Sequence, residues 1–343
     1  MNGAFMELLS NPTDRPRNGS VVSIRDFGPE RTIKMVEDIV AGNDTLPQSP
    51  GSLVATLFLN RSLRTRLGVA KACAVLGASH IDLEPNRIYS PIISGPGEPY
   101  KQEAMEDIVR VINLNADCLA VRAYGPSSSV SVGAGDAVFE RMLRSVTVPV
   151  INLETDSGHP IQAMADVATV VEHCGTARGR KVVMAWAHSP EPKPIAVPAS
   201  FVMAASAAGA HLVIAAPSEF SLPASLTRAA RDWAGKAGGS LTETSDLGQA
   251  LDNADILYMK SWMSWEQKGR GHQEIAGVYH HWMASEELFH RATPKAGYLH
   301  CLPADRGLEV TDDLLDGERS LIWRQVEMRR RVTQQLLANA LRL

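Results

Sequence analysis

The chain has 343 residues, 45% of them hydrophobic and 21% charged, and a formal net charge of −4. This length is enough for two domains with a sizeable core, and the lack of a basic excess argues against a protein that binds nucleic acid. No apolar run approaches the roughly 20 residues that cross a bilayer, and residues 1–18 lack the plan of a signal peptide. The four cysteines are scattered without a CxxC pair, so we expect reduced thiols and a cytoplasmic protein.

Short apolar runs alternate with helical patterns in the first half of the chain. They predict strands at 52–59, 80–83, 117–122 and 148–153. They predict helices at 67–77, 105–114 and 159–174. Residues 94–100 are rich in Gly and Pro, and we expect them to form a loop.

A second alternating series begins after residue 180. It predicts strands at 181–186, 211–216, 256–260 and 298–302. It predicts helices at 199–208, 224–237 and 326–341. Residues 269–277 are a further loop candidate.

This alternation is typical of parallel sheets that are covered by helices on both faces. We therefore expect the α/β class, with two doubly wound parallel-sheet domains joined near residues 154–160. In such folds ligands bind beyond the carboxyl ends of the strands, so we look for the site there.

The segment Ser62-Leu63-Arg64-Thr65-Arg66 joins a predicted strand to a predicted helix. The unpaired N–H groups and the dipole at a helix N-terminus attract a phosphate, and Arg64 and Arg66 could add bidentate bonds. The segment therefore predicts a phosphate site. The alternative is an N-capped helix whose arginines are solvated.

Three polar residues follow at the ends of predicted elements. Arg122 ends a strand, while His159 and Gln162 open a helix whose first turn contains Pro160. On the expected fold all three lie at the cleft between the domains. The alternatives are a solvated cation and a histidine that only caps or packs.

Three more candidates lie in the second half. Lys260 ends a predicted strand, Cys301 precedes an abrupt turn at Pro303, and Arg329 belongs to the last predicted helix. Their alternatives are a solvated lysine, a buried cysteine that acts as a small hydrophobe, and a surface charge pair.

The order of these segments and their amino-acid sequences resemble the aspartate and ornithine carbamoyltransferase family from about residue 53 to residue 341. The resemblance implies a carbamoyl-phosphate domain at 1–153 and an acceptor domain at 154–325. It also implies that the last helix, within 326–343, packs back on the first domain, and that active sites lie between the subunits of a homotrimer.

The same resemblance implies roles for individual residues. The catalytic residues would be Arg64, His159, Gln162 and Cys301, with Cys301 a wall of the pocket rather than a nucleophile. The residues that would hold carbamoyl phosphate are Ser62, Leu63, Arg64, Thr65, Arg122, His159, Gln162, Cys301, Leu302 and Arg329. This reaction needs cations on a dianionic phosphate, donors on the carbonyl oxygen and a fixed approach of the amine. It needs no metal and no cofactor.

The acceptor side is where members of the family differ. The run 258–263 stands where the ornithine enzymes have a Ser-Met-Gly loop and an aspartate, and here Lys260 replaces the anion. Lys260-Ser261-Trp262 and the proline-rich run 186–198 are similar to the N-acetylornithine and N-succinylornithine carbamoyltransferases, which implies a knot in the second domain. The residues that would bind the acceptor are Glu154, Lys260, Leu302, Asp305 and Arg306.

The chain also departs from those enzymes. Asp305 stands where they have an arginine, and Arg306 could replace that arginine if the turn shifts by one residue. Met328 replaces an asparagine, Leu67 and Gly68 stand where hydroxyl residues are usual, and the run 86–89 stands where a tryptophan loop is expected.

We therefore expect an enzyme that moves the carbamoyl group from carbamoyl phosphate to the δ-amine of an N-acylated, ornithine-like acceptor. A citrulline-type product and phosphate would result, as in arginine biosynthesis. The alternatives are an ornithine carbamoyltransferase, a carbamoyltransferase for another amine, and a carbamoyl-phosphate-binding relative without catalysis. An oxidoreductase is disfavoured because no GxGxxG follows a predicted strand.

Overall fold

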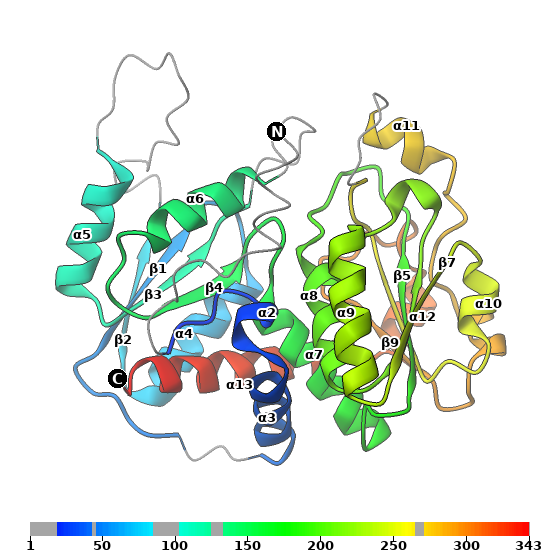
Figure 1. Cartoon of the computed structure of the whole chain (residues 1–343), viewed down its shortest axis with the longest axis horizontal. Coiled ribbons are helices and arrows are strands. Elements are labelled where there is room, and N and C mark those ends of the chain that lie inside the picture. The colour runs from blue at the N-terminus through cyan, green and yellow to red at the C-terminus, as the bar shows by residue number, and fades with distance from the viewer. Residues whose placement is uncertain (1–18, 43–45, 85–102, 125–132, 265–270, 343) are drawn as a thin grey trace.

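The computed structural model describes residues 19–42, 46–84, 103–124, 133–264 and 271–342. These residues form two parallel sheets that lie side by side, with helices packed against them (Figure 1). The predicted α/β class with two parallel sheets is therefore confirmed. In the part of the chain that the structure describes, no helix is long and apolar enough to cross a membrane.

The first sheet has the strand order β2-β1-β3-β4. Its strands are β1 (Leu53–Phe58), β2 (Ser79–Leu83), β3 (Cys118–Arg122) and β4 (Val150–Glu154). Side chains alternate between the faces of a strand, so Val54 and Phe58 belong to one core cluster and Ala55 and Leu57 to another. The first cluster includes α4 (Arg64–Leu76), and the second includes α5 (Met105–Asn115) and α6 (Ala134–Leu143).

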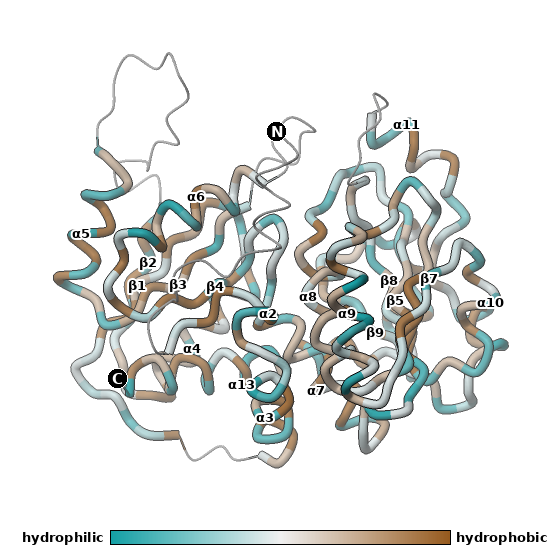
Figure 2. The backbone as a smooth tube through the Cα atoms, viewed as in Figure 1, coloured by the Kyte–Doolittle hydropathy of each residue, from teal (hydrophilic) through white to brown (hydrophobic). Residues whose placement is uncertain are grey.

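The second sheet has the strand order β7-β6-β5-β8-β9. Its strands are β5 (Lys181–Trp186), β6 (His211–Ala215), β7 (Ser240–Thr244), β8 (Ile256–Lys260) and β9 (Gly297–Leu299). The central strands β5 and β8 are buried almost throughout, as parallel strands covered on both faces are, and they are largely apolar (Figure 2). The helices α8 (Ala196–Ala207) and α9 (Ala224–Lys236) pack together beside this sheet (Figure 1).

Two long helices join the halves of the molecule. The helix α7 (Pro160–Cys174) follows β4 and is buried over its first eleven residues. The helix α13 (Ile322–Ala340) packs against both α7 and α4 (Figure 1). The last helix therefore returns from the second sheet to the first, and one continuous core extends across both halves.

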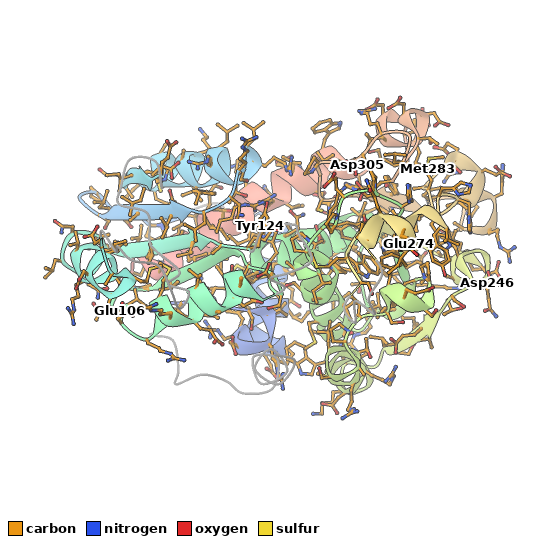
Figure 3. All side chains as sticks on the ribbon, turned by 90° about the horizontal axis from the view of Figure 1, so that it is seen from above. Glu106, Tyr124, Asp246, Glu274, Met283 and Asp305 are labelled. Atoms are coloured by element: carbon orange, nitrogen blue, oxygen red, sulfur yellow. The ribbon has the colours of Figure 1, made fainter. Side chains whose placement is uncertain are left out.

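The carboxyl ends of the strands gather polar residues toward the middle of the molecule. Figure 3 labels Tyr124 and Asp305 there, whereas Glu106 and Asp246 lie toward opposite ends. The first two residues follow the ends of β3 and β9, so the predicted position of the site, beyond the strand ends, is the place where the two sheets approach each other.

Several elements differ from the sequence prediction. The expected loop at 269–277 is wrong for its described part, because α11 (His272–Gly277) forms there. Its Ile275 and Ala276 are buried, and His272 Nε2 lies 3.0 Å from the carbonyl oxygen of Ser189. Tertiary packing thus stabilises a short helix that glycine-rich flanks argue against.

Other helices were missed or shortened by the apolar pattern. The helix α4 begins at Arg64 rather than residue 67, and α13 begins at Ile322 rather than residue 326. The prediction also lacked β7 and the elements α2 (Ile24–Phe27), α3 (Pro29–Val40), α6, α10 (Leu247–Leu251), α12 (Asp312–Asp316), η1 (Ser218–Phe220) and η2 (Glu286–Arg291). The expectations for 1–18, 86–89 and 94–100 lie outside the described residues.

Candidate functional site

The start of α4 connects the two sheets directly. Arg64 donates a hydrogen bond from Nη2 to the carbonyl oxygen of Leu302, 238 residues later in the chain. The N–H of Thr65 donates to Ser62 Oγ at 3.3 Å. The side chain of Leu63 is 71% exposed, so only its backbone could take part in the site.

Arg66 does not belong to this cluster, although the motif offered it as a second phosphate ligand. Its guanidinium pairs with Asp82, lies 3.5 Å from Glu84, and stacks 4.3 Å from the ring centroid of Phe58. The reason is helical geometry, because residues two apart in a helix point in different directions. The structure therefore does not bring the Arg66 guanidinium to the candidate phosphate site.

Neighbouring strands bring the next residues together. Arg122 at the end of β3 is in register with Glu154 at the end of β4, and its Nη1 donates to Glu154 Oε2. The same oxygen lies 3.7 Å from His159 Nε2. The N–H of His159 donates to Ser200 Oγ at 2.8 Å, which ties the start of α7 to α8.

His159 is surrounded by positive charge. Burial lowers the pKa of its imidazole well below the ordinary value, and the nearby cations Arg329, Arg122 and Arg64 lower it further. The ring is therefore neutral at physiological pH. A neutral imidazole can donate a hydrogen bond without adding to the charge of the cluster.

The third guanidinium comes from α13. Arg329 is buried and donates from Nη2 to Thr65 Oγ1. Burial, followed by the like charges of Arg122 and Arg64, lowers its pKa to about 10. Three arginines this close repel one another, and the Nε atoms of Arg64 and Arg122 have no hydrogen-bond partner among the described residues. This cluster suits an anion with more than one charge.

Gln162 stands on α7 beside a buried carboxylate. Its Nε2 donates to Asp166 Oδ1 at 2.6 Å, and that oxygen also accepts from Gln325 Nε2 at 2.5 Å. The signal in the sequence was the spacing of four residues, which places Gln162 and Asp166 on one helix face. The contribution of Gln325 from α13 was not predicted.

Lys260 and Cys301 lie at the ends of adjacent strands in the second sheet. Burial raises the pKa of the Cys301 thiol, so the thiol is neutral and a poor nucleophile. Burial opposes the charge on Lys260, but the carboxylates of Glu309 and Glu154 help to raise its pKa overall. Lys260 is therefore a buried ammonium group at the end of β8.

Sequence reasoning missed the ion-pair network beside Lys260. Lys193 Nζ donates to Asp305 Oδ2 at 2.8 Å and to Glu309 Oε2 at 2.7 Å. Glu309 is fully buried and accepts from the N–H of Ser261 at 2.7 Å. Lys193 lies in the proline-rich run and Glu309 in the run after Cys301, but no spacing links two residues that stand 116 apart.

Asp305 and Arg306 therefore differ in what they can do. Asp305 is held by Lys193 and by Ser189 Oγ at 2.6 Å, so its charge is already paired. Arg306 is largely exposed and pairs with Asp312 and Asp316 at 2.5 and 2.8 Å. The structure does not bring the Arg306 guanidinium into the cluster.

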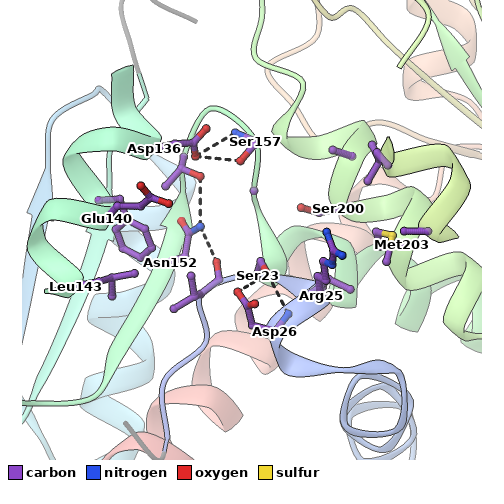
Figure 4. A pocket seen from close by; sticks show the side chains of 18 of the residues that line it. Ser23, Arg25, Asp26, Asp136, Glu140, Leu143, Asn152, Ser157, Ser200 and Met203 are labelled. Carbon is purple, nitrogen blue, oxygen red and sulfur yellow. Dashed lines mark hydrogen bonds between the residues drawn. The ribbon is translucent and has the colours of Figure 1, made fainter. Parts of the chain in front are cut away.

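A cavity of about 540 Å³ lies between the two halves of the molecule. Thr155, Ser157 and Gly158, in the turn after β4, are among the residues that line it. Figure 4 shows Ser23, Asp136, Asn152 and Ser200 around it. None of the candidate phosphate or acceptor residues lines it. Within the described ranges, no group of three or more His, Cys, Asp or Glu side chains could hold a metal ion.

Two family models match the chain. The model of the carbamoyl-P binding domain of aspartate/ornithine carbamoyltransferase matches residues 21–172. The model of the Asp/Orn binding domain matches residues 194–340. Together they cover the first sheet, the helix α13 and all strands of the second sheet except β5, which lies between the two matches.

Curated relatives and solved structures are similar over most of the chain. An ornithine carbamoyltransferase of Hyperthermus butylicus is 29% identical over 325 residues, covering 93% of this chain and 96% of that protein. An N-acetylornithine carbamoyltransferase of Xanthomonas axonopodis pv. citri is 29% identical over 299 residues, covering 84% and 86%. A crystal structure of acetylornithine transcarbamylase with acetylcitrulline has a TM-score of 0.84 at 25% identity and covers 93% and 98%.

Proposed function

Because the chain belongs to the aspartate/ornithine carbamoyltransferase family, we propose that it carbamoylates the δ-amine of an N-acylated ornithine. The family itself gives the coarser activity, transfer of a carbamoyl group from carbamoyl phosphate to an ornithine-like acceptor. The finer proposal concerns the acceptor and the role of each residue.

The observation that carries the donor half is the convergence of Arg64, Arg122 and Arg329 around neutral His159. A dianionic phosphate relieves the repulsion among the arginines, since each can form a charge-assisted hydrogen bond to it. The hydroxyls of Ser62 and Thr65 stand at the same helix start. We assign the phosphate to these groups.

The reaction also needs help at the carbonyl. The amine lone pair attacks the carbamoyl carbon, a tetrahedral oxyanion forms, and the bond from carbon to the phosphate oxygen breaks. The amine proton leaves with the phosphate. Arg64, Arg122 and His159 would donate to the oxyanion, while Cys301 and Leu302 form the wall that fixes the approach of the amine.

On the acceptor side, the support comes from Lys260. Among the described residues its ammonium forms no salt bridge, whereas neighbouring Lys193 is paired with two carboxylates. An acceptor with a carboxylate and an uncharged acylated α-nitrogen matches this cation better than one with a free α-ammonium group. Glu154 lies between the two halves of the site and could hold the acceptor once Arg122 engages the donor.

Plain ornithine is the second candidate acceptor. The relatives named ornithine carbamoyltransferase, at 29% identity, favour it, as does the acidic Asp305 in place of an arginine. We also propose the homotrimer, the knot in the second domain, the cytoplasmic location and the domain spans 1–153 and 154–325. Light scattering of the purified protein tests the trimer.

The test is an assay of purified protein with carbamoyl phosphate and N-acetylornithine, N-succinylornithine or ornithine. Phosphate release and a ureido product by mass spectrometry should appear with an acylated acceptor. In Lys260→Met we expect the acceptor KM to rise about tenfold or more while the donor KM changes little, because one charge-assisted bond is lost. Lys260→Arg is the matched control and should retain more activity. If the protein carbamoylates ornithine but neither acylated acceptor, the proposal of an N-acylated acceptor is overturned.

A further inference from the structure

A fully buried carboxylate next to Gln162 has no role in the reaction as described above. Asp166 lies one turn after Gln162 on α7, and its exposed fraction is 0%. Its Oδ1 accepts from the amide nitrogens of Gln162 and Gln325. Two side-chain amides therefore direct their NH2 groups at one oxygen atom.

This contact fixes which way the Gln162 amide faces. An amide that donates through Nε2 turns its oxygen in the other direction. Gln162 Oε1 is buried and has no hydrogen-bond partner among the described residues. A buried acceptor without a donor is costly, so this oxygen is suited to a ligand that brings an N–H group.

Hydrogen bonds also connect Asp166 to the segment around Cys301 at the end of the second sheet. Gln325 Oε1 accepts from the N–H of His300 at 3.2 Å, and His300 immediately precedes Cys301. The N–H of Leu302 donates to His300 Nδ1 at 3.0 Å. Asp166 is thus connected, through Gln325, to the loop that forms the wall of the carbamoyl pocket.

We propose that Asp166 is a positioning residue that keeps the oxygen of the Gln162 amide turned toward the nitrogen of the carbamoyl group. The site then distinguishes a donor with an NH2 group from one with a methyl group of similar size. This inference rests on the proposed function. Asp166 acts through Gln162 and does not touch the donor.

The experiment compares the binding of carbamoyl phosphate and acetyl phosphate by titration calorimetry. In Asp166→Ala we expect the affinity for carbamoyl phosphate to fall about tenfold, the value of one hydrogen bond. The affinity for acetyl phosphate, which has no N–H to donate, should stay unchanged. Asp166→Asn can keep an oxygen acceptor in the same place and should remain close to the wild type.

Thr169→Val is the matched control for disturbing α7. Thr169 lies one turn after Asp166, and its hydroxyl donates only to the carbonyl oxygen of Ala165, at 2.8 Å. If Asp166→Ala does not fold, Asp166→Val fills the space and gives the same test.

Three results would overturn the proposal. The first is that Asp166→Ala loses affinity for carbamoyl phosphate and acetyl phosphate equally, and the second is that it loses affinity for neither. The third is that Asp166→Asn binds carbamoyl phosphate as weakly as Asp166→Ala does. A wild-type protein that binds no carbamoyl phosphate would instead overturn the proposed function, and the positioning role would fall with it.

Discussion

The donor and acceptor sides of the site each contain one carboxylate that is completely buried, and the two have opposite electrostatics. Asp166 on the donor side has the neutral amides of Gln162 and Gln325 as partners, and burial raises its pKa to about 7. Burial also opposes ionisation of Glu309 on the acceptor side. There, His300 and the ammonium groups of Lys260 and Lys193 lower the pKa below its ordinary value.

The two halves of the site also differ in how their charges are paired before any substrate binds. On the acceptor side, Lys193 forms ion pairs with both Asp305 and Glu309. Among the described donor-side residues, only one of the three arginines, Arg122, forms a salt bridge, and its partner is Glu154. We infer that the donor half needs its ligand's charge, whereas the acceptor half supplies most of its own.

Glu309→Gln should have the largest effect on the free energy of unfolding. The change removes one of the two carboxylates that pair with Lys193 and a negative charge that supports the buried ammonium of Lys260, so we expect a loss of about 3–5 kcal/mol. Asp166→Asn is the matched change on the donor side and should cost only about 1 kcal/mol, because its partners are neutral. Urea unfolding of both variants measures the difference. Equal costs would show that the two carboxylates are not held differently.

Arg64→Ala should have the next largest effect, on donor binding. We expect the Kd of carbamoyl phosphate to rise about a hundredfold, since charge-assisted bonds to the phosphate are lost. Arg66→Ala is the matched control two residues away, and it should change the Kd by less than about threefold because its guanidinium pairs with Asp82. Calorimetry decides between them, and the assignment fails if Arg66→Ala is the more damaging change.

The pH dependence of the free energy of unfolding should also separate the two carboxylates. The pKa of Asp166 rises from 3.8 to about 7 on folding, so the folded state binds the proton more tightly. Its contribution is present below about pH 4 and declines as the pH rises to 7. The pKa of Glu309 is lowered, so its contribution is present above about pH 4.5 and is lost only in acid.

The measurement is the unfolding free energy of the wild type minus that of each variant between pH 4 and 8. For Asp166→Asn this difference should decrease toward pH 7 and then level off. For Glu309→Gln it should stay level above about pH 5. A difference for Asp166→Asn that grows with pH would contradict the raised pKa.

The sequence predicted well what depends on local pattern. Strand β5 and strand β8 were predicted with their observed bounds, because buried parallel strands are continuous apolar runs. The helix α4 was predicted after an apolar strand and a polar segment, although it begins at Arg64 rather than at residue 67. Local pattern also placed His159 and Gln162 at the head of α7, where the structure has them.

Partners from distant segments could not be predicted in the same way. Arg66 and Arg64 look alike in the sequence, and only the position of β2 beside β1 decides that Arg66 pairs with Asp82. In the sequence, Arg306 is a candidate to replace a missing arginine. In the structure, α12 supplies Asp312 and Asp316 as its partners. Glu309 and Lys193 gave no signal, because a fully buried ion pair depends on the tertiary fold.

The helix α13 has a consequence for the synthesis of the protein. Arg329 contacts Thr65 across 264 residues of sequence, so the cationic pocket is complete only after nearly all of the described chain has been translated. A ribosome-bound or prematurely terminated chain that lacks this helix has the residues of the first sheet and the segment 62–66, but it lacks one of the three arginines. On the proposed function, such chains bind the donor more weakly than the chain that includes the helix.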